Sequence, residues 1–355
     1  INQYYFKEAN VDVTGDPHWA ASFGAGQLGF YVQDKWDVSN SFQLTYGLRM
    51  DMPLFFDRPA ENAPFNEWAA QNGYSFKTNQ KLSSAPMWSP RVGFRWDLNN
   101  DHKFILRGGV GIFTGRIPFV WLSNSFSNTG IQLSSYTARR SDKISLILDP
   151  NKQSENGQQL TAWSGSQLIN VFDKDFKFSQ NLRANLGIDF KLLGIDWTAE
   201  AIYSKTLNDV YYQNVAYTES GKTLADETGL YWDNRPMYER VTKGLPFNEI
   251  YVLKNTNKGY TYSLSLKADK SFACGLDLSA SYTFTQSKSI SSATSSQAQS
   301  NWRNTQTYRF SNSPELSYSA YNIPHMIKAS AFYHFNIANN KMFTTTIGII
   351  YQGRS

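Results

Sequence analysis

The sequence has very little cysteine, few histidines and no long apolar run. Its 355 residues include one cysteine, Cys274, and four scattered histidines, His18, His102, His325 and His334, without the spacing of metal ligands. A disulfide framework within the chain is therefore excluded, and a cysteine-based zinc site is not expected. No apolar run reaches the roughly 18 residues that a membrane-spanning helix needs, which excludes a helical membrane protein. We accordingly expect neither a metal nor a cofactor.

The charge of the chain has only a weak bias toward one sign. Its 34 lysines and arginines against 29 aspartates and glutamates give a net charge of +5, and the basic residues are spread rather than clustered. A nucleic-acid-binding protein usually gathers them on one face, so no nucleic-acid partner is expected. No Asp or Glu stands beside a His in a pattern typical of a catalytic site, and we expect no enzymatic activity.

A glycine-rich motif lies near the start of the chain. Residues 23–36, FGAGQLGFYVQDKW, place glycines at the spacing of a dinucleotide-binding fingerprint. That fingerprint binds a nucleotide only where a strand leads into the glycines and a helix follows them. Here an alternation of apolar and polar residues follows, which has the period of a strand. We interpret Gly24 and Gly26 as the loop leading into that strand, and Gly29 as relief of crowding on its polar face.

What the sequence has in abundance is aromatic residues, at 15%, and segments in which apolar and polar residues alternate. In residues 42–51, for example, Phe42, Leu44 and Tyr46 alternate with Gln43 and Thr45, as on a strand with one apolar face. The same pattern predicts ten strands in five pairs: 26–37 with 42–51, 91–97 with 104–112, 182–190 with 195–203, 260–269 with 276–284, and 325–335 with 341–351.

The connections between these strands fall into two classes. The short ones, within pairs, are residues 38–41, 98–102, 191–194, 270–275 and 336–340, and the long ones, between pairs, are residues 52–90, 114–177, 204–258 and 286–323. Loops beyond about 15 residues are uncommon in compact domains. Strict alternation puts all short turns at one end and all long loops at the other, as in outer-membrane barrels. The pattern predicts an all-β fold, a transmembrane antiparallel up-and-down β-barrel with long extracellular loops.

Aromatic residues near the short turns favour the same fold. They are Trp36, Phe42, Trp96, Phe104, Phe190 and Trp197. Amphipathic rings prefer the membrane–water boundary, so these residues are expected to form one aromatic girdle. The alternative is a soluble β-sandwich, whose strands also alternate but whose connections are usually shorter at both ends.

The order of the strands also bears on domain organisation. In an up-and-down barrel, residues 1 and 355 would both fall on the long-loop side, whereas single-chain barrels normally have both termini at the short turns. We therefore expect residues 1–355 to be one segment, about ten strands, of a single larger barrel domain. A plug domain and the remaining strands would lie outside this chain.

Three stretches resemble a known family. GFYVQDKWDVSNSFQLTYGLRMD (29–51) resembles the "YxQDxW…LTLxxGLRYD" hairpin of TonB-dependent outer-membrane receptors, and residues 88–115 are similar to the hairpin that follows it there. NIPHMIKASAFYHF (322–335) resembles the "xxPHRxxxSxxYxF" strand of the Oar-like and SusC-like branches, although Met326 stands where that strand has Arg. These motifs cover about a quarter of the chain.

The resemblance implies a 22-stranded barrel in the bacterial outer membrane that is filled by an N-terminal plug. An energised periplasmic partner opens the barrel by pulling on a short sequence segment, the TonB-contacting box. Neither plug nor box is recognisable in this sequence. It implies TonB-dependent uptake of a large nutrient: an oligosaccharide, a peptide or a metal chelate. The expected partners are outer-membrane lipid, the TonB complex acting through the plug, a surface lipoprotein and the nutrient itself. The alternative is a passive channel or barrel scaffold without energy coupling.

Two groups of side chains are candidates for contacting the nutrient. Charged residues on the polar faces are expected to line the barrel interior: Arg49, Asp51, Arg95, Arg107, Arg183, Asp189, Glu200 and Lys267. Aromatic residues in the long loops are expected to stack on a ligand: Trp68, Trp88, Trp121, Trp163, Tyr231 and Trp232. The alternatives are that the charges pair with one another or with the plug, and that the aromatic residues pack inside folded loops. The serine-rich stretch 289–301 is expected to be a mobile loop tip.

Overall fold

The computed structural model describes residues 3–116, 118–153, 155–156, 159, 167–307, 309–336 and 344–355. Its strands are β1 (Gln3–Ala9), β2 (Ala25–Asp37), β3 (Phe42–Phe55), β4 (Met87–Asp97), β5 (Phe104–Thr114), β6 (Leu133–Arg139), β7 (Gln167–Phe172), β8 (Gln180–Leu192), β9 (Ile195–Asn214), β10 (Tyr217–Thr223), β11 (Pro236–Arg240), β12 (Phe247–Thr256), β13 (Tyr260–Ser271), β14 (Leu276–Ser289), β15 (Ser317–Tyr318), β16 (His325–Asn336) and β17 (Thr344–Arg354). Its helices are α1 (Val11–Thr14), α2 (Ala63–Gln71), α3 (Phe119–Ser127), α5 (Leu224–Thr228) and α6 (Ala298–Arg303), with short 3-10 turns η1 (Arg140–Asp142) and η2 (Pro150–Lys152). No helix in this described part is long and apolar enough to cross a membrane.

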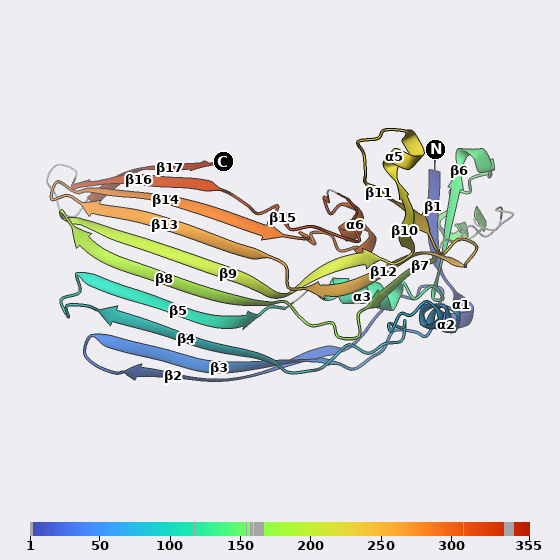
Figure 1. Ribbon diagram of the computed structural model, residues 1–355, viewed down its shortest axis with the longest axis horizontal. Coiled ribbons are helices and arrows are strands. Elements are labelled where there is room, and N and C mark those ends of the chain that lie inside the picture. The colour runs from blue at the N-terminus through green and yellow to red at the C-terminus, as the bar shows by residue number, and fades with distance from the viewer. Residues whose placement is uncertain are drawn as a thin grey trace.

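Ten long strands form one antiparallel sheet in which neighbours in the chain are neighbours in space (Figure 1). The order is β17-β16-β14-β13-β9-β8-β5-β4-β3-β2, so all five predicted strand pairs are confirmed. The last predicted strand begins in residues 341–343, which lie outside the described residues. Within the described residues the sheet is open: β2 and β17 form its two edges instead of pairing with each other.

The register of the strands gives the sheet two chemically different faces. Leu44 lies opposite Phe94, whereas Arg95 lies opposite Arg107, and this separation of apolar from polar positions continues across the sheet. On the apolar face, Phe30, Leu264 and Ile349 expose 62%, 53% and 71% of their surface. In the described part of the chain that face is not buried against a second sheet, which rules out the β-sandwich. Such a wide exposed apolar surface is instead suited to lipid.

The expected aromatic girdle is confirmed at the short-turn end of the apolar face. Phe42 lies opposite Trp96, with ring centroids 6.4 Å apart. Phe104, Phe190 and Trp197 are stacked in a row on three adjacent strands, with centroid separations of 6.3 and 6.4 Å. The rings therefore lie side by side at one level of the sheet, as an interfacial belt requires.

The long connections contain much of the remaining secondary structure. Strand β12 pairs in parallel with β7 and antiparallel with residues 209–214 at the end of β9. Figure 1 shows this small sheet at the long-loop end, near helices α2, α3 and α6, with the β1–β6 and β10–β11 pairs projecting beyond it. We call β7, β12, residues 209–214, α2, α3 and α6 the loop layer.

Strand β12 separates two apolar clusters in the loop layer. Tyr251 and Leu253 point into one cluster, together with side chains of α3 and α6, while Ile250 and Val252 point into the other, with Phe65 of α2. All five of these side chains are at most 2% exposed. The hydrophobic core of the described chain therefore lies in the loops and not between the membrane-spanning strands.

The loop layer packs against the polar face of the large sheet. The first cluster includes Phe55 at the end of β3 and Met87 at the start of β4. Phe55 has the same side-chain direction as Arg49 and Asp51, because residues two apart on a strand share a face. On the opposite face at the same end, Trp88 remains 52% exposed. The polar face is thus covered at its long-loop end, while the apolar face remains open along its length.

The serine-rich stretch 289–301 is packed, so the expectation of a mobile loop tip is corrected. Trp121 Nε1 of α3 donates a hydrogen bond to the Ser295 carbonyl at 2.8 Å. Ala298 and Asn301 of α6 are 2% and 5% exposed. The sequence pattern was misleading because composition does not show the contacts that hold this stretch, which come from Trp121, far away in the chain, and from Asn301 within the stretch itself.

The whole protein is expected to show heat-modifiable mobility in gels. A closed barrel resists detergent until its inter-strand hydrogen bonds are broken by heat, so the unboiled sample should migrate at a different apparent mass from the boiled one. Gel electrophoresis of outer membranes dissolved in detergent, with and without boiling, measures this. Identical mobility in both lanes would contradict the barrel.

Candidate functional site

The charged candidates on the polar face form short, well-aligned ion pairs. Arg49 donates to Asp51 twice, from Nε to Oδ2 at 2.8 Å and from Nη2 to Oδ1 at 2.7 Å. Gln27 Nε2 donates to Asp51 Oδ1 at 3.0 Å. Asp51 is only 3% exposed, so its charge is compensated by bonds on both oxygens.

Arg107 is the centre of a second group, on β5, β8 and β9. Its Nε donates to Asp189 Oδ2 at 3.1 Å and its Nη1 to Glu200 Oε1 at 2.9 Å. Thr198 Oγ1 donates to the other oxygen of Asp189 at 2.8 Å. Lys267, on the next strand, pairs with Asp269 of its own strand at 2.8 Å. Each of these charged candidates is therefore paired within the sheet: Arg49 with Asp51, Arg107 with Asp189 and Glu200, and Lys267 with Asp269.

Two candidate arginines are left over. Arg95 lies directly opposite Arg107, and Arg183 lies opposite Gly111. Both are exposed, and neither has an ion pair or side-chain hydrogen bond to another described residue. Arg91, on the other side of Gly111, places its guanidinium 5.6 Å from the centre of the Phe113 ring.

A pair of glycines lies between these arginines on the polar face. Gly93 and Gly109 are paired between the row of Arg95 and Arg107 and the row that contains Arg91 and Arg183. We call Arg91, Arg95, Arg107 and Arg183 the arginine patch. Among the described residues, only Arg107 of the patch forms ion pairs with carboxylates, so the patch is a positive, hydrogen-bond-donating surface. Guanidinium groups there can bind carboxylate, phosphate or hydroxyl oxygens.

Two other glycines of the polar face make room for the paired arginines. A Cβ atom at Gly187 would lie 3.0 Å from Arg107 Cζ, and one at Gly29 would lie 2.8 Å from Arg49 Nη2. The interpretation of Gly29 as relief of crowding is therefore confirmed. Gly24 precedes β2 and Gly26 is its second residue, which also agrees with the sequence.

Replacing Gly187 by Val should weaken the Arg107 ion pairs. The new side chain would displace the guanidinium from Asp189 and Glu200, and the loss should be about 1 kcal/mol because these groups are partly exposed. Gly93→Val is the matched control, since its Cβ would meet only the Gly108 carbonyl at 3.4 Å. Thermal unfolding of both variants measures the difference; equal midpoints would show that Gly187 does not serve the arginine.

The loop aromatics have several different environments. Trp88 is on β4 and on the apolar face, so its assignment to a loop was wrong; the strand begins earlier than the alternation predicts. Trp121 of α3 and Trp68 of α2 pack against the two clusters of the loop layer. Trp232 and Tyr231 are 66% and 88% exposed. Trp163 lies outside the described residues.

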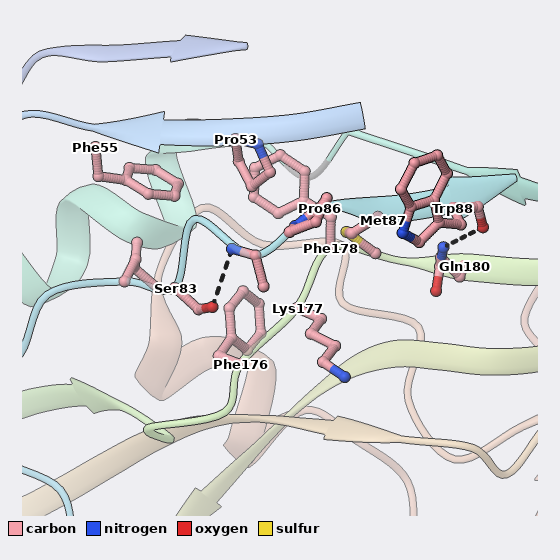
Figure 2. Close-up of a pocket in the computed structure, with 12 residues that line it drawn as sticks. Pro53, Phe55, Ser83, Pro86, Met87, Trp88, Phe176, Lys177, Phe178 and Gln180 are labelled. Carbon is pink, nitrogen blue, oxygen red and sulfur yellow. Dashed lines mark hydrogen bonds between the residues drawn. The ribbon is translucent and has the colours of Figure 1, made fainter. Parts of the chain in front are cut away.

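An apolar pocket lies where the loop layer joins the strands (Figure 2). Its volume is about 280 Å³. The side chains that line it come from the end of β3, residues 82–88 and residues 176–180, and include Phe55, Phe176 and Phe178. Gln180 Nε2 closes one side by donating to the Trp88 carbonyl at 3.3 Å. The pocket is smaller than most ligand sites, which begin near 300 Å³.

A buried ionic network in the loop layer was missed from the sequence. Glu249 is 7% exposed and accepts hydrogen bonds from Asn214 Nδ2, from Tyr251 OH at 3.0 Å and from Arg240 Nη2 at 3.3 Å. Burial, followed by the Glu249 charge, raises the pKa of Tyr251 above its ordinary value. The signal in the sequence was a single acid inside the apolar run of β12. The described residues contain no cluster of three or more groups suited to a metal ion.

Comparison with known proteins identifies the class of this one. Residues 13–352 match the family described as outer membrane beta-barrel domain. The match covers nearly the whole chain, which therefore belongs to that family and lies in the bacterial outer membrane. No curated protein sequence matches the chain.

Several solved structures are similar in fold to this chain. The siderophore receptor PirA of Pseudomonas aeruginosa has 12% identity and a TM-score of 0.43, with 93% of this chain and 40% of that chain covered. For the FrpB iron transporter of Neisseria meningitidis the values are 11%, 0.44, 94% and 34%. For the outer membrane transporter YddB of Escherichia coli they are 13%, 0.44, 93% and 38%. The chain thus spans well under half the length of these proteins.

Proposed function

We propose that this chain is part of the barrel of a TonB-dependent importer that takes up a large nutrient across the outer membrane. The hairpin motif at 29–51 supports this class, and the motif at 322–335 supports its Oar-like and SusC-like branch. In this proposal the ten strands belong to a barrel of 22, and a plug outside residues 1–355 connects it to the TonB complex. The chain itself catalyses no reaction.

The observation that carries the proposal is the packed loop layer over the polar face. A passive channel needs an open path along its polar surface at both ends. Here Phe55 and Met87 of that surface are 3% and 5% exposed, beneath loops with a hydrophobic core of their own. Packed loops over the polar face support selective binding of a nutrient rather than free diffusion of solutes through an open channel.

The side chains divide by role within this proposal. Arg95 and Arg183, which have no partner among the described residues, contact the nutrient as it passes along the wall. The ion-paired residues stabilise the barrel wall; they are Arg49, Asp51, Arg107 and Lys267. The exposed Trp232 and Tyr231 at the loop end would meet the nutrient or a surface lipoprotein.

Conductance of the whole protein tests this proposal without knowledge of the nutrient. Purified full-length protein is inserted into a planar bilayer in potassium chloride solution. A plugged importer should insert without steady current, and current should appear only after urea loosens the plug. A steady conductance in buffer alone would refute the importer and support the passive channel.

A further inference from the structure

A larger cavity lies in the connection between β14 and β16. Its volume is about 430 Å³, within the range of small-molecule sites. Its walls are residues 289–295 at the end of β14 and after it, residues 300–301 and 304–306 in and after α6, and residues 317–320 around β15. None of these residues belongs to the arginine patch or to the pocket of Figure 2.

The chemistry of this cavity is unusual for the protein. None of its lining residues is charged, and most of them are serine, threonine, asparagine or glutamine. The pocket of Figure 2, in contrast, is largely apolar and carries Lys177, and a third cavity carries Glu219 and Lys254. A charged ligand would find no opposite charge on these walls, and an apolar ligand would leave many polar groups unsatisfied.

One of the lining residues, Asn301, holds the backbone of the cavity in place, while many of the other polar side chains make no hydrogen bond to a described residue. Asn301 is 5% exposed and bonds to both the backbone nitrogen and the carbonyl of Ser295, each at 2.8 Å. The side chains that make no hydrogen bond to another described residue include those of Ser291, Ser292, Thr294, Ser300, Asn304 and Gln306. Hydroxyls and amides both donate and accept, so they match a partner that does the same.

An aromatic ring stands at the edge of the cavity. Tyr318 is 65% exposed, and Lys288 Nζ lies 5.1 Å from the centre of its ring. The ammonium group occupies one face of the ring, which leaves the other for an apolar face of a ligand. Stacking on an aromatic ring together with many neutral hydrogen bonds is the combination that a sugar ring requires.

We propose that this cavity binds a neutral oligosaccharide. The binding itself follows from the cavity, whereas its role as a capture step for import rests on the proposed function. The ligand would place hydroxyl groups against the free side chains of Ser291, Ser292, Thr294, Ser300, Asn304 and Gln306, and one sugar ring against Tyr318. Anionic and cationic oligosaccharides should bind less well, because none of the lining groups carries a compensating charge and the Lys288 ammonium, which is not among them, already interacts with the Tyr318 ring.

Binding by the full-length protein in detergent tests the proposal. The probes are an array of neutral oligosaccharides of glucose, mannose, xylose and arabinose, with oligogalacturonate and glucosamine oligomers as charged counterparts. We expect at least one neutral probe to bind, and the double variant Ser300→Ala, Asn304→Ala to weaken it by about tenfold, which corresponds to the loss of one or two hydrogen bonds. Asn257→Ala, an exposed amide between β12 and β13, is the matched control.

Two results would overturn the inference. One is an array in which no neutral probe binds, or in which a charged probe binds more tightly. The other is binding that the double variant leaves unchanged, which would locate the site elsewhere. Because the altered side chains make no internal hydrogen bond, the variant should keep its fold, and heat-modifiable mobility verifies this. A protein that binds the probe yet conducts steadily in a bilayer would fail the importer proposal and keep this one.

Discussion

Ile250→Asp is expected to unfold the loop layer while the ten-stranded sheet remains intact. Ile250 is fully buried at the centre of β12, opposite Ile169 of β7. A carboxyl group there has no partner, and the lost apolar packing and the desolvation together should cost on the order of 4 kcal/mol. Of the ten long strands, only the end of β9 pairs with β12, and no described residue of these strands belongs to the buried cluster around Ile250. The ten strands are held by their own inter-strand hydrogen bonds.

Hydrogen exchange measures this prediction strand by strand. Amides of β7 and β12 should lose protection in the variant, while those of β13 and β14 keep theirs. Leu148→Asp is the matched control, because Leu148 is 77% exposed and should tolerate the charge. Unchanged protection of β12 would mean that its cluster is not the core of the loop layer.

Gly275→Ala is expected to cause the largest loss of stability among the short turns. Gly275 has φ of 88°, and an added Cβ would overlap the carbonyl oxygen of His334 on the neighbouring strand. That carbonyl belongs to the backbone and cannot move without breaking the hydrogen bond from His334 N to Gly275 O, at 2.8 Å. The cost should be about 3 kcal/mol or more, from strained backbone and lost pairing together.

A second glycine separates the two causes. Gly221 has a similar φ of 77°, but a Cβ there would meet no atom within 4 Å. Gly221→Ala should therefore cost only about 1 kcal/mol, from the left-handed backbone alone. Urea unfolding of both variants gives the difference. If the two variants lose the same free energy of unfolding, then the contact with His334 is unimportant and the φ angle explains the whole loss.

The spanning strands were predictable because their signal is local. The alternation in residues 42–51 and 260–269 reports which face each residue occupies, and lipid on one side with a polar interior on the other enforces it along every strand. The girdle residues followed from the same signal, since rings beside a short turn on either strand of a pair come to lie at one level.

The loops were less predictable for the opposite reason. Their order depends on contacts between distant parts of the chain, such as β7 with β12, or Trp121 with Ser295. Residues 289–301 look like a mobile serine-rich tip by composition, yet they are fixed by α3 and by their own Asn301. Trp88 was placed in a loop because Pro90 and the residues before it interrupt the alternation, although β4 continues through them.

By itself, the sequence determined the all-β class, the ten strands, their pairing and the division into an apolar and a polar face, because the period of two is written in neighbouring residues. Only the tertiary structure decided which charges are paired, which arginines are left free, and that the loops close over the polar face. Those outcomes depend on contacts between side chains of strands and loops that are far apart in the chain, and such contacts leave no pattern among neighbouring residues of the sequence.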